Sequence, residues 1–192
     1  RLSDPSAPVL PQLEGVIGWL VADPRLGLVE RIMTRSPLTL LRSDVSQLPE
    51  PARREIVRNL LELAQREMLD VWDNELPRRI GRAGYPTLLD ELRPWIQDRE
   101  RNQLARVLAI RFAEACGFGA AASTMLLAIA LDLAEPLEVR HQAVIVIRDR
   151  GDREARRGLR SLAIASDETD ERDDLKGEAL RALWPAELTS RE

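Results

Sequence analysis

Residues 136–165 read PLEVRHQAVIVIRDR and then GDREARRGLRSLAIA, and this stretch decides the fold. It contains the pattern Val139-Arg140-x-x-Ala143. A similar pattern, Ala105-Arg106-x-x-Ala109, lies 34 residues earlier, and Leu175-Lys176-x-x-Ala179 lies 36 residues later. A pair of helices that recurs at this spacing is typical of a helical solenoid, in which neighbouring pairs stack because one pair cannot bury both its apolar faces alone.

Apolar residues spaced three and four apart predict helices along most of the chain, and no stretch alternates apolar and polar residues as a strand does. We therefore expect an all-α protein. The regular part is predicted to pair helix 102–116 with helix 120–132 and helix 136–149 with helix 152–165, and a third pair begins at Asp173. The preceding part is predicted to contain helices at 10–22, 24–35, about 46–68 and 86–97, with a short helix inside 69–86.

One proline and one aspartate bear on these helix boundaries. Pro94 lies inside the predicted helix 86–97, where a proline removes one backbone hydrogen bond, so we expect it to end or kink that helix. Asp173 lies within the acidic stretch 167–174, which lacks the central glycine of a calcium-binding loop and is read as a solvated loop. Asp173 itself is expected to cap the next helix.

The repeat is regular only from about residue 98 onward. We therefore divide the chain into residues 1–97, which are irregular helical repeats or a helical cap, and residues 98–192, which are regular repeats continuous with the first part. The chain begins at Arg1, and residues 185–192 read like the start of another helix. This suggests an excised piece of a longer protein.

The composition is that of a well-charged protein with an aliphatic core: 44% of the 192 residues are hydrophobic, 31% are charged and only 4% are aromatic. A net charge of −4 argues against general nucleic-acid binding, which requires clustered positive charge. Cys116 is the only cysteine, which fits a reducing, cytoplasmic setting. No apolar run approaches the roughly 20 residues that span a bilayer, and no signal peptide is recognised.

The sequence offers little for catalysis. A nucleotide-binding P-loop ends in Gly-Lys-Ser/Thr, but the one lysine, Lys176, lies between Leu175 and Gly177. One histidine and one cysteine cannot form a zinc site of four soft ligands. His141 on the flank of a repeat helix and Cys116 at a helix end are read as structural residues. We therefore expect no cofactor, no metal and no enzymatic activity; an enzyme that uses His141 or the carboxylates is the alternative.

Four tryptophans are scattered through the chain. Trp19 and Trp184 end apolar stripes and are predicted to lie in the core. Trp72 and Trp95 flank the irregular stretch and are expected either to pin it or to line a contact site.

The strongest local charge feature is a strip of four arginines within 152–165. Their spacing of three, one and three residues puts all four on one helix face, opposite Leu159 and Leu162. This arginine strip is either a solvated face balanced by neighbouring acidic residues or a docking site for an acidic partner or nucleic acid. It consists of Arg153, Arg156, Arg157 and Arg160.

The pattern Val139-Arg140-x-x-Ala143, together with Gly151-Asp152-x-x-Ala155, resembles a HEAT repeat of the bacterial lyase-associated kind. The resemblance covers 136–165 well, 102–132 less fully, and 173–192 as half a unit. It implies a HEAT-like α-solenoid, a right-handed superhelix of stacked helix pairs, and says nothing of function.

Three further segments resemble the helical-repeat region of large bacterial NACHT-type signal-transducing NTPases, several of which act in antiphage defence: 19–24, 41–48 and 173–185. The resemblance implies a sensor or regulatory module that binds a protein partner or an attached domain of the same polypeptide. We expect no binding to a membrane. A nucleic-acid-binding HEAT module that uses the arginine strip is the alternative.

Overall fold

The structure is a computed structural model that describes residues 44–69, 79–164 and 170–184. Every regular element in these ranges is a helix and none is a strand, so this part of the chain is all-helical, as predicted. The predicted helices 10–22 and 24–35 and residues 70–78 lie outside the described residues. The elements are η1 (Val45–Gln47), α4 (Glu50–Gln65), η2 (Gly81–Ala83), α6 (Leu88–Gln97), α7 (Gln103–Ala115), α8 (Gly119–Leu131), α9 (Leu137–Arg150), α10 (Arg153–Gly158), α11 (Arg160–Ile164) and α12 (Asp174–Leu183).

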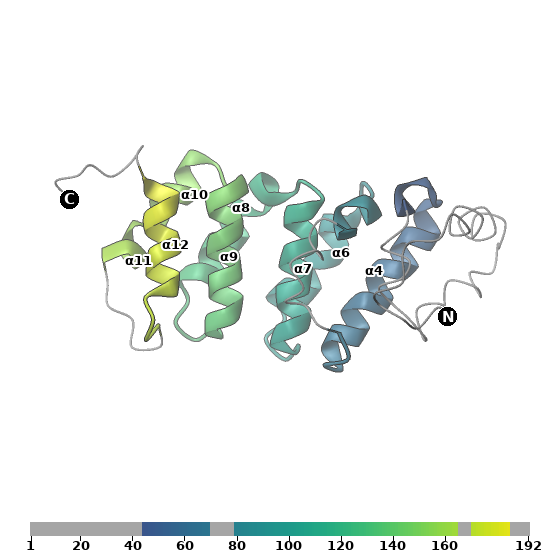
Figure 1. Cartoon of the computed structure of the whole chain (residues 1–192), viewed down its shortest axis with the longest axis horizontal. Helices are drawn as coiled ribbons and strands as arrows, with labels where there is room; N and C mark the ends of the chain where they lie inside the picture. Colours follow the sequence, from purple (N-terminus) through teal and green to yellow (C-terminus); the bar gives the residue numbers. More distant parts are fainter. Residues whose placement is uncertain (1–43, 70–78, 165–169, 185–192) are drawn as a thin grey trace, which may run out of the picture.

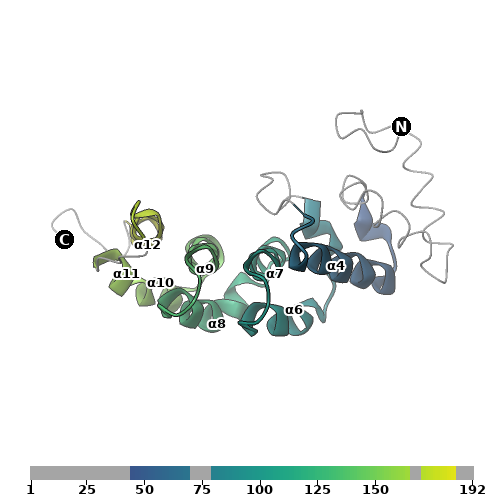
Figure 2. The same cartoon turned by 90° about the horizontal axis from the view of Figure 1, so that it is seen from below.

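The helices form a row of two layers (Figures 1 and 2). We call α6, α8 and α10–α11 layer A, and α4, α7, α9 and α12 layer B. Within layer B each helix packs on the next, from α4 through α7 and α9 to α12. None of the helices in the described ranges is both long and apolar enough to cross a lipid bilayer.

The helix pairs are offset by one helix from the predicted pairs. The most extensive packing between consecutive helices joins α6 with α7, α8 with α9, and α11 with α12. The predicted pairs, α7 with α8 and α9 with α10–α11, make far smaller contacts. The predicted pairing was therefore wrong by one helix. The short links between the predicted partners do not determine which apolar faces pack together.

A buried arginine joins the two helices of each central pair. Arg106, the fourth residue of α7, is only 1% exposed, and its Nε donates to the carbonyl oxygen of Ile96 in α6 at 3.0 Å. Arg140, the fourth residue of α9, is fully buried and donates in the same way to Ala130 in α8 at 3.2 Å. A carbonyl in the last turn of a helix lacks an intrahelical donor, so the arginine satisfies it. The Val-Arg-x-x-Ala pattern thus marks the second helix of a pair.

The loop between α8 and α9 adds an ionic contact to the preceding pair. Glu135 is buried there, and its Oε2 lies 2.5 Å from Nη1 of Arg106. Its other oxygen, Oε1, accepts from Nε of Arg99 at 3.0 Å, and Arg99 also pairs with Asp132. Removing one partner of a buried ion pair typically costs about 3–5 kcal/mol, because the other charge is left buried and unpaired, so loss of Glu135 would leave the buried Arg106 guanidinium uncompensated.

The core follows the predicted helical stripes. The small residues Ala143 and Ala179, predicted at close helix approaches, are fully buried. The stripe of α4 is buried except for Leu63, which is half-buried. It comprises Ile56, Leu60, Leu61 and Ala64.

Pro94 does not end α6, which continues to Gln97. The backbone N–H of Asp98 still donates to the carbonyl of Pro94 at 3.3 Å. The bond that a proline at this position removes would end on the carbonyl of Asp90, one turn earlier. Asp90 and Pro94 both lie on the exposed face of α6, where water can bond to that carbonyl.

Asp173 precedes α12, but its side chain makes no capping hydrogen bond. Its backbone is left-handed, with φ 56°, a conformation that aspartate tolerates better than most residues. The buried Asp170 takes the capping role instead, because its Oδ2 accepts from the backbone N–H of Lys176 at 3.1 Å. Asp173 therefore occupies the predicted N-cap position, but the capping side chain is that of Asp170.

Candidate interaction surface

The arginine strip lies on α10 and α11, which a turn at Leu159 separates. The predicted single helix 152–165 is therefore two short helices. Asp152 caps the first of them, because its Oδ1 accepts from the backbone N–H of Ala155 at 2.7 Å. The apolar side of the pair is buried at Ala155 and Leu159, as predicted.

The two short helices leave three of the four arginines exposed: Arg153, Arg157 and Arg160. Arg156 is half-buried, and its Nε donates to the carbonyl oxygen of Ile147 in α9 at 3.4 Å. The structure therefore brings the strip together on one surface, with Arg156 partly withdrawn from it.

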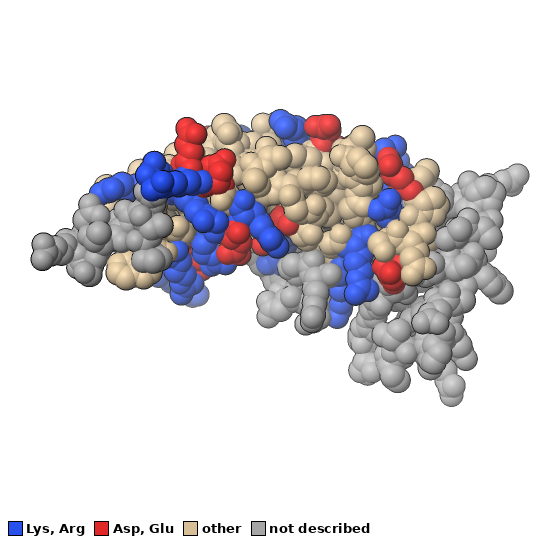
Figure 3. Space-filling view, turned by 90° about the horizontal axis from the view of Figure 1, so that it is seen from above, with Lys and Arg blue, Asp and Glu red and all other residues tan. Residues whose placement is uncertain are grey.

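Charged residues of α9 and α12, which belong to layer B, pair with one another near the same end of the row. Arg148 pairs with Asp149 at 2.7 Å and with Glu178 of α12, and the hydrogen bond that it donates to Asp149 raises the pKa of the Arg148 guanidinium. Arg181 pairs with Glu178 at 2.5 Å. Figure 3 shows basic and acidic side chains gathered toward the C-terminal end of the molecule, while uncharged residues cover much of the middle of that face.

The local charge around the strip is positive. Residues 148–160 contain six arginines and three carboxylates, a formal excess of three positive charges. The chain as a whole has a net charge of −4. The segment that carries the strip is therefore basic within a chain that is acidic overall.

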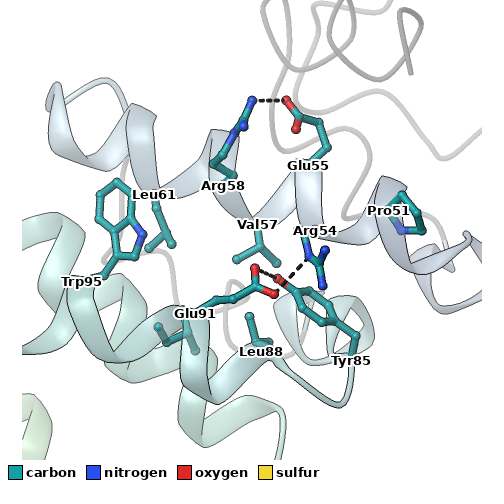
Figure 4. Close-up of a pocket in the computed structure, with 11 residues that line it drawn as sticks. Pro51, Arg54, Glu55, Val57, Arg58, Leu61, Tyr85, Leu88, Glu91 and Trp95 are labelled. Carbon is teal, nitrogen blue, oxygen red and sulfur yellow. Dashed lines mark hydrogen bonds and ion pairs between the residues drawn. The ribbon is translucent and has the colours of Figure 1, made fainter. Parts of the chain in front are cut away.

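A second candidate is a groove between α4 and α6, with a volume of about 350 Å³ (Figure 4). Its floor is apolar, and its rim carries charged side chains. Trp95 stands at one end and Tyr85 at the other. The floor is formed by Val57, Leu61, Leu88 and Leu92.

The polar groups at the Tyr85 end of the groove bond to one another. The Tyr85 hydroxyl donates to Oε2 of Glu91 at 2.9 Å, and Nε of Arg54 lies 3.0 Å from the other oxygen of Glu91. Burial, together with the Glu91 carboxylate, raises the pKa of Tyr85, so its hydroxyl stays protonated. Glu91 in turn raises the pKa of Arg54. These groups satisfy one another, and the apolar residues of the floor are themselves at most 3% exposed.

The tryptophan predictions have mixed outcomes. Trp95 lines the groove, and the guanidinium of Arg101 stacks 3.9 Å from its ring centroid, a cation–π contact. Trp184 is 57% exposed, so its predicted place in the core is wrong: it follows the last residue of α12, beyond the contacts of that helix with α9 and α11. Trp19 and Trp72 lie outside the described residues.

Neither of the residues considered for catalysis belongs to the arginine strip or lines the groove. His141 is half-buried on α9. Cys116 is half-buried after α7, and burial raises the pKa of its thiol to about 11, which makes it a poor nucleophile at neutral pH. Within the described ranges, no group of three or more histidine, cysteine, aspartate or glutamate side chains is arranged to bind a metal ion.

The sequence reasoning missed Arg53. It is the fourth residue of α4, as Arg106 is of α7 and Arg140 of α9. The signal is visible in the sequence, because Ala52-Arg53 is followed by Ile56 just as Ala105-Arg106 is followed by Ala109. Arg53 was missed because it does not follow the repeat length: 53 residues separate it from Arg106, whereas 34 residues separate Arg106 from Arg140.

Comparison of the chain with protein-family models, with curated proteins and with solved structures finds no match.

Proposed function

We propose that this chain is a HEAT-like α-solenoid, a right-handed superhelix of stacked helix pairs, that acts as a protein-recognition or regulatory module without catalysis of its own. The support comes from α6–α7 and α8–α9, two pairs joined by an arginine at the same helix position. Stacks of this kind present long surfaces built from equivalent positions of successive pairs, which suits them to bind other macromolecules.

The exposed arginine strip is the surface that carries this proposal. Arg153, Arg157 and Arg160 project from short helices whose opposite side is buried, so they are presented on a fixed support. Arginine forms paired hydrogen bonds with carboxylates, and an excess of positive charge speeds encounter with an acidic surface. The partner is therefore an acidic protein segment, from another protein or from an attached domain.

The test is a titration with a fluorescent polyglutamate peptide. The parent chain should bind the peptide, and the triple variant Arg153→Glu/Arg157→Glu/Arg160→Glu should not. A matched variant, Arg66→Glu/Arg82→Glu/Arg93→Glu, makes the same charge change at exposed arginines of the other half and should bind like the parent. Added salt should weaken binding. Equal binding by both variants, or no binding by the parent, would refute the docking role of the strip.

A second candidate function is nucleic-acid binding through the same strip. The observation in its favour is the local excess of positive charge, since arginine also binds phosphate. A DNA duplex in the same titration separates the two. Tighter binding of the duplex than of polyglutamate, lost in the strip variant, would favour the nucleic-acid function.

The wider context of the proposal is the resemblance to the repeat region of bacterial NACHT-type NTPases. In that context the chain is the cytoplasmic sensor or regulatory arm of a signalling or antiphage defence protein. Binding at the strip would change the curvature of the row and so bias an attached NTPase. Sequencing the coding region upstream of residue 1 tests this, because it should encode a Walker motif; a coding region without one would remove the NACHT assignment but not the binding role.

A further inference from the structure

The α12 end of the row presents a helix position that is buried in the preceding repeats. In the described part of the chain α7 and α9 each pack on a following layer B helix, whereas α12 packs on α9, α10 and α11. The residue directly after the alanine of the Val-Arg-x-x-Ala pattern is Ile110 in α7 and Val144 in α9, and both are fully buried. Its equivalent in α12 is Leu180, which is 40% exposed. α12 therefore exposes an apolar position that is buried wherever a further layer B helix follows.

Two further accessible side chains lie on the same helix face as Leu180. Lys176 precedes it by four residues and Trp184 follows it by four, and residues four apart lie one above the other on a helix. The backbone N–H of Trp184 donates to the carbonyl oxygen of Leu180 at 3.0 Å, so the helical course continues to Trp184. Lys176 is half-buried and Trp184 is exposed. This end face of α12 thus presents an ammonium group, an aliphatic side chain and an indole ring in line.

The end face is complementary to itself. In a contact between two copies related by a two-fold axis, a residue i that meets j is matched by a residue j that meets i. Antiparallel packing of two α12 helices with Leu180 at the axis brings Leu180 against Leu180 and Lys176 of each copy against Trp184 of the other. An ammonium over an indole face is a favourable cation–π contact. Lys176 is available for it, because its ion pair with Asp173 is long, at 3.9 Å.

We propose that the end face is a homotypic interface, at which α12 packs antiparallel on α12 of a second copy of this chain. Gly177 leaves open space beside Leu180, because a Cβ atom there would meet nothing within 4 Å. α11, whose last residue Ile164 is 73% exposed, packs beside α12 at this end of the row (Figure 2). A contact of one or two helices per copy is smaller than a standard interface of about 1,600 Å², so the dimer forms at micromolar concentrations or above.

Sedimentation equilibrium of the full chain, from micromolar to millimolar concentration, tests the interface. The parent should pass from monomer to dimer. Leu180→Glu buries a charge twice in each dimer and should weaken the association by more than about tenfold. Leu133→Glu is the matched control, because Leu133 lies in the loop between α8 and α9 and is 71% exposed; it should associate like the parent. A parent that stays monomeric, or equal weakening by both variants, would overturn the proposal and leave the arginine-strip titration unaffected.

Disulfide crosslinking of single-cysteine variants, made in a Cys116→Ala chain, tests the antiparallel arrangement. Leu180→Cys lies at the axis and should give a disulfide-linked dimer on mild oxidation. Lys176→Cys and Trp184→Cys should each crosslink severalfold less alone than when the two are mixed, because each of these positions meets the other. Self-crosslinking of Lys176→Cys as strong as that of the mixture would overturn the arrangement, and so would a yield from Leu180→Cys no higher than that from Leu133→Cys.

Discussion

Ala143 and Ala179 are fully buried at equivalent positions of α9 and α12, which pack directly on each other in layer B. Ala143→Leu adds three carbon atoms at a fully buried site. We expect it to destabilise the fold by roughly 1–3 kcal/mol through overpacking. Urea unfolding of the parent and the variant, followed by circular dichroism, measures the difference. An unchanged unfolding midpoint would mean that the neighbours of Ala143 can give way.

Cys116 gives a second prediction at the residue scale. A pKa of about 11 in place of the ordinary value near 9 leaves about 100-fold less thiolate at pH 8, because the raised pKa delays deprotonation. The native chain should therefore react with iodoacetamide about 100-fold more slowly than the chain in urea. The native rate should rise with pH up to a midpoint near 11, whereas a midpoint near 9 would show that the thiol is not desolvated.

At the scale of elements, the close approach of α8 to α9 depends on Gly119. A Cβ atom there would lie 2.2 Å from Cβ of Arg150, which is too close for two carbon atoms. Gly119→Ala should therefore destabilise the fold by about 1–3 kcal/mol, as overpacking does. Gly177 in α12 is the control, since a Cβ there meets nothing within 4 Å. Gly177→Ala should stabilise the fold by up to about 1 kcal/mol, because alanine favours the helix. Thermal unfolding of both variants tests the pair, and equal shifts would contradict it.

The helices themselves could be predicted, but their partners could not. Apolar periodicity placed α7, α8 and α9 within a residue or two, because each helix buries one stripe of its own sequence. The pairing of helices depends on which neighbouring helix a side chain contacts. The hydrogen bond from Arg106 to Ile96 cannot be inferred from the spacing of apolar residues in the sequence. The exposure of Arg153, Arg157 and Arg160 was predictable from their helix face, whereas the partial burial of Arg156 was not. The groove was not predictable, because its walls come from two separate segments, 51–61 and 85–95.

At the scale of the whole molecule, contacts in the described part of the chain join mainly neighbours along the row. Such a row has extended surfaces rather than an enclosed site, and its sequence contains no P-loop motif. We expect the purified chain to show no ATP turnover and no thermal shift with Mg-ATP. Saturable binding of one nucleotide per chain, measured by calorimetry, would contradict this expectation. A Lys176→Ala variant provides the control, since it removes the only lysine and should behave like the parent.

Arg106 of α7 and Arg140 of α9 both donate a hydrogen bond to a main-chain carbonyl oxygen, a group that every amino acid has. Mutation in the last turn of α6 or α8 therefore leaves the acceptor in place. A duplicated or exchanged helix pair would bring its own donor and would meet an acceptor of the same kind. Descendants of this gene can thus gain or lose whole pairs by recombination without compensating mutations at these junctions, and relatives of different length should keep the arginine while the helix opposite it drifts.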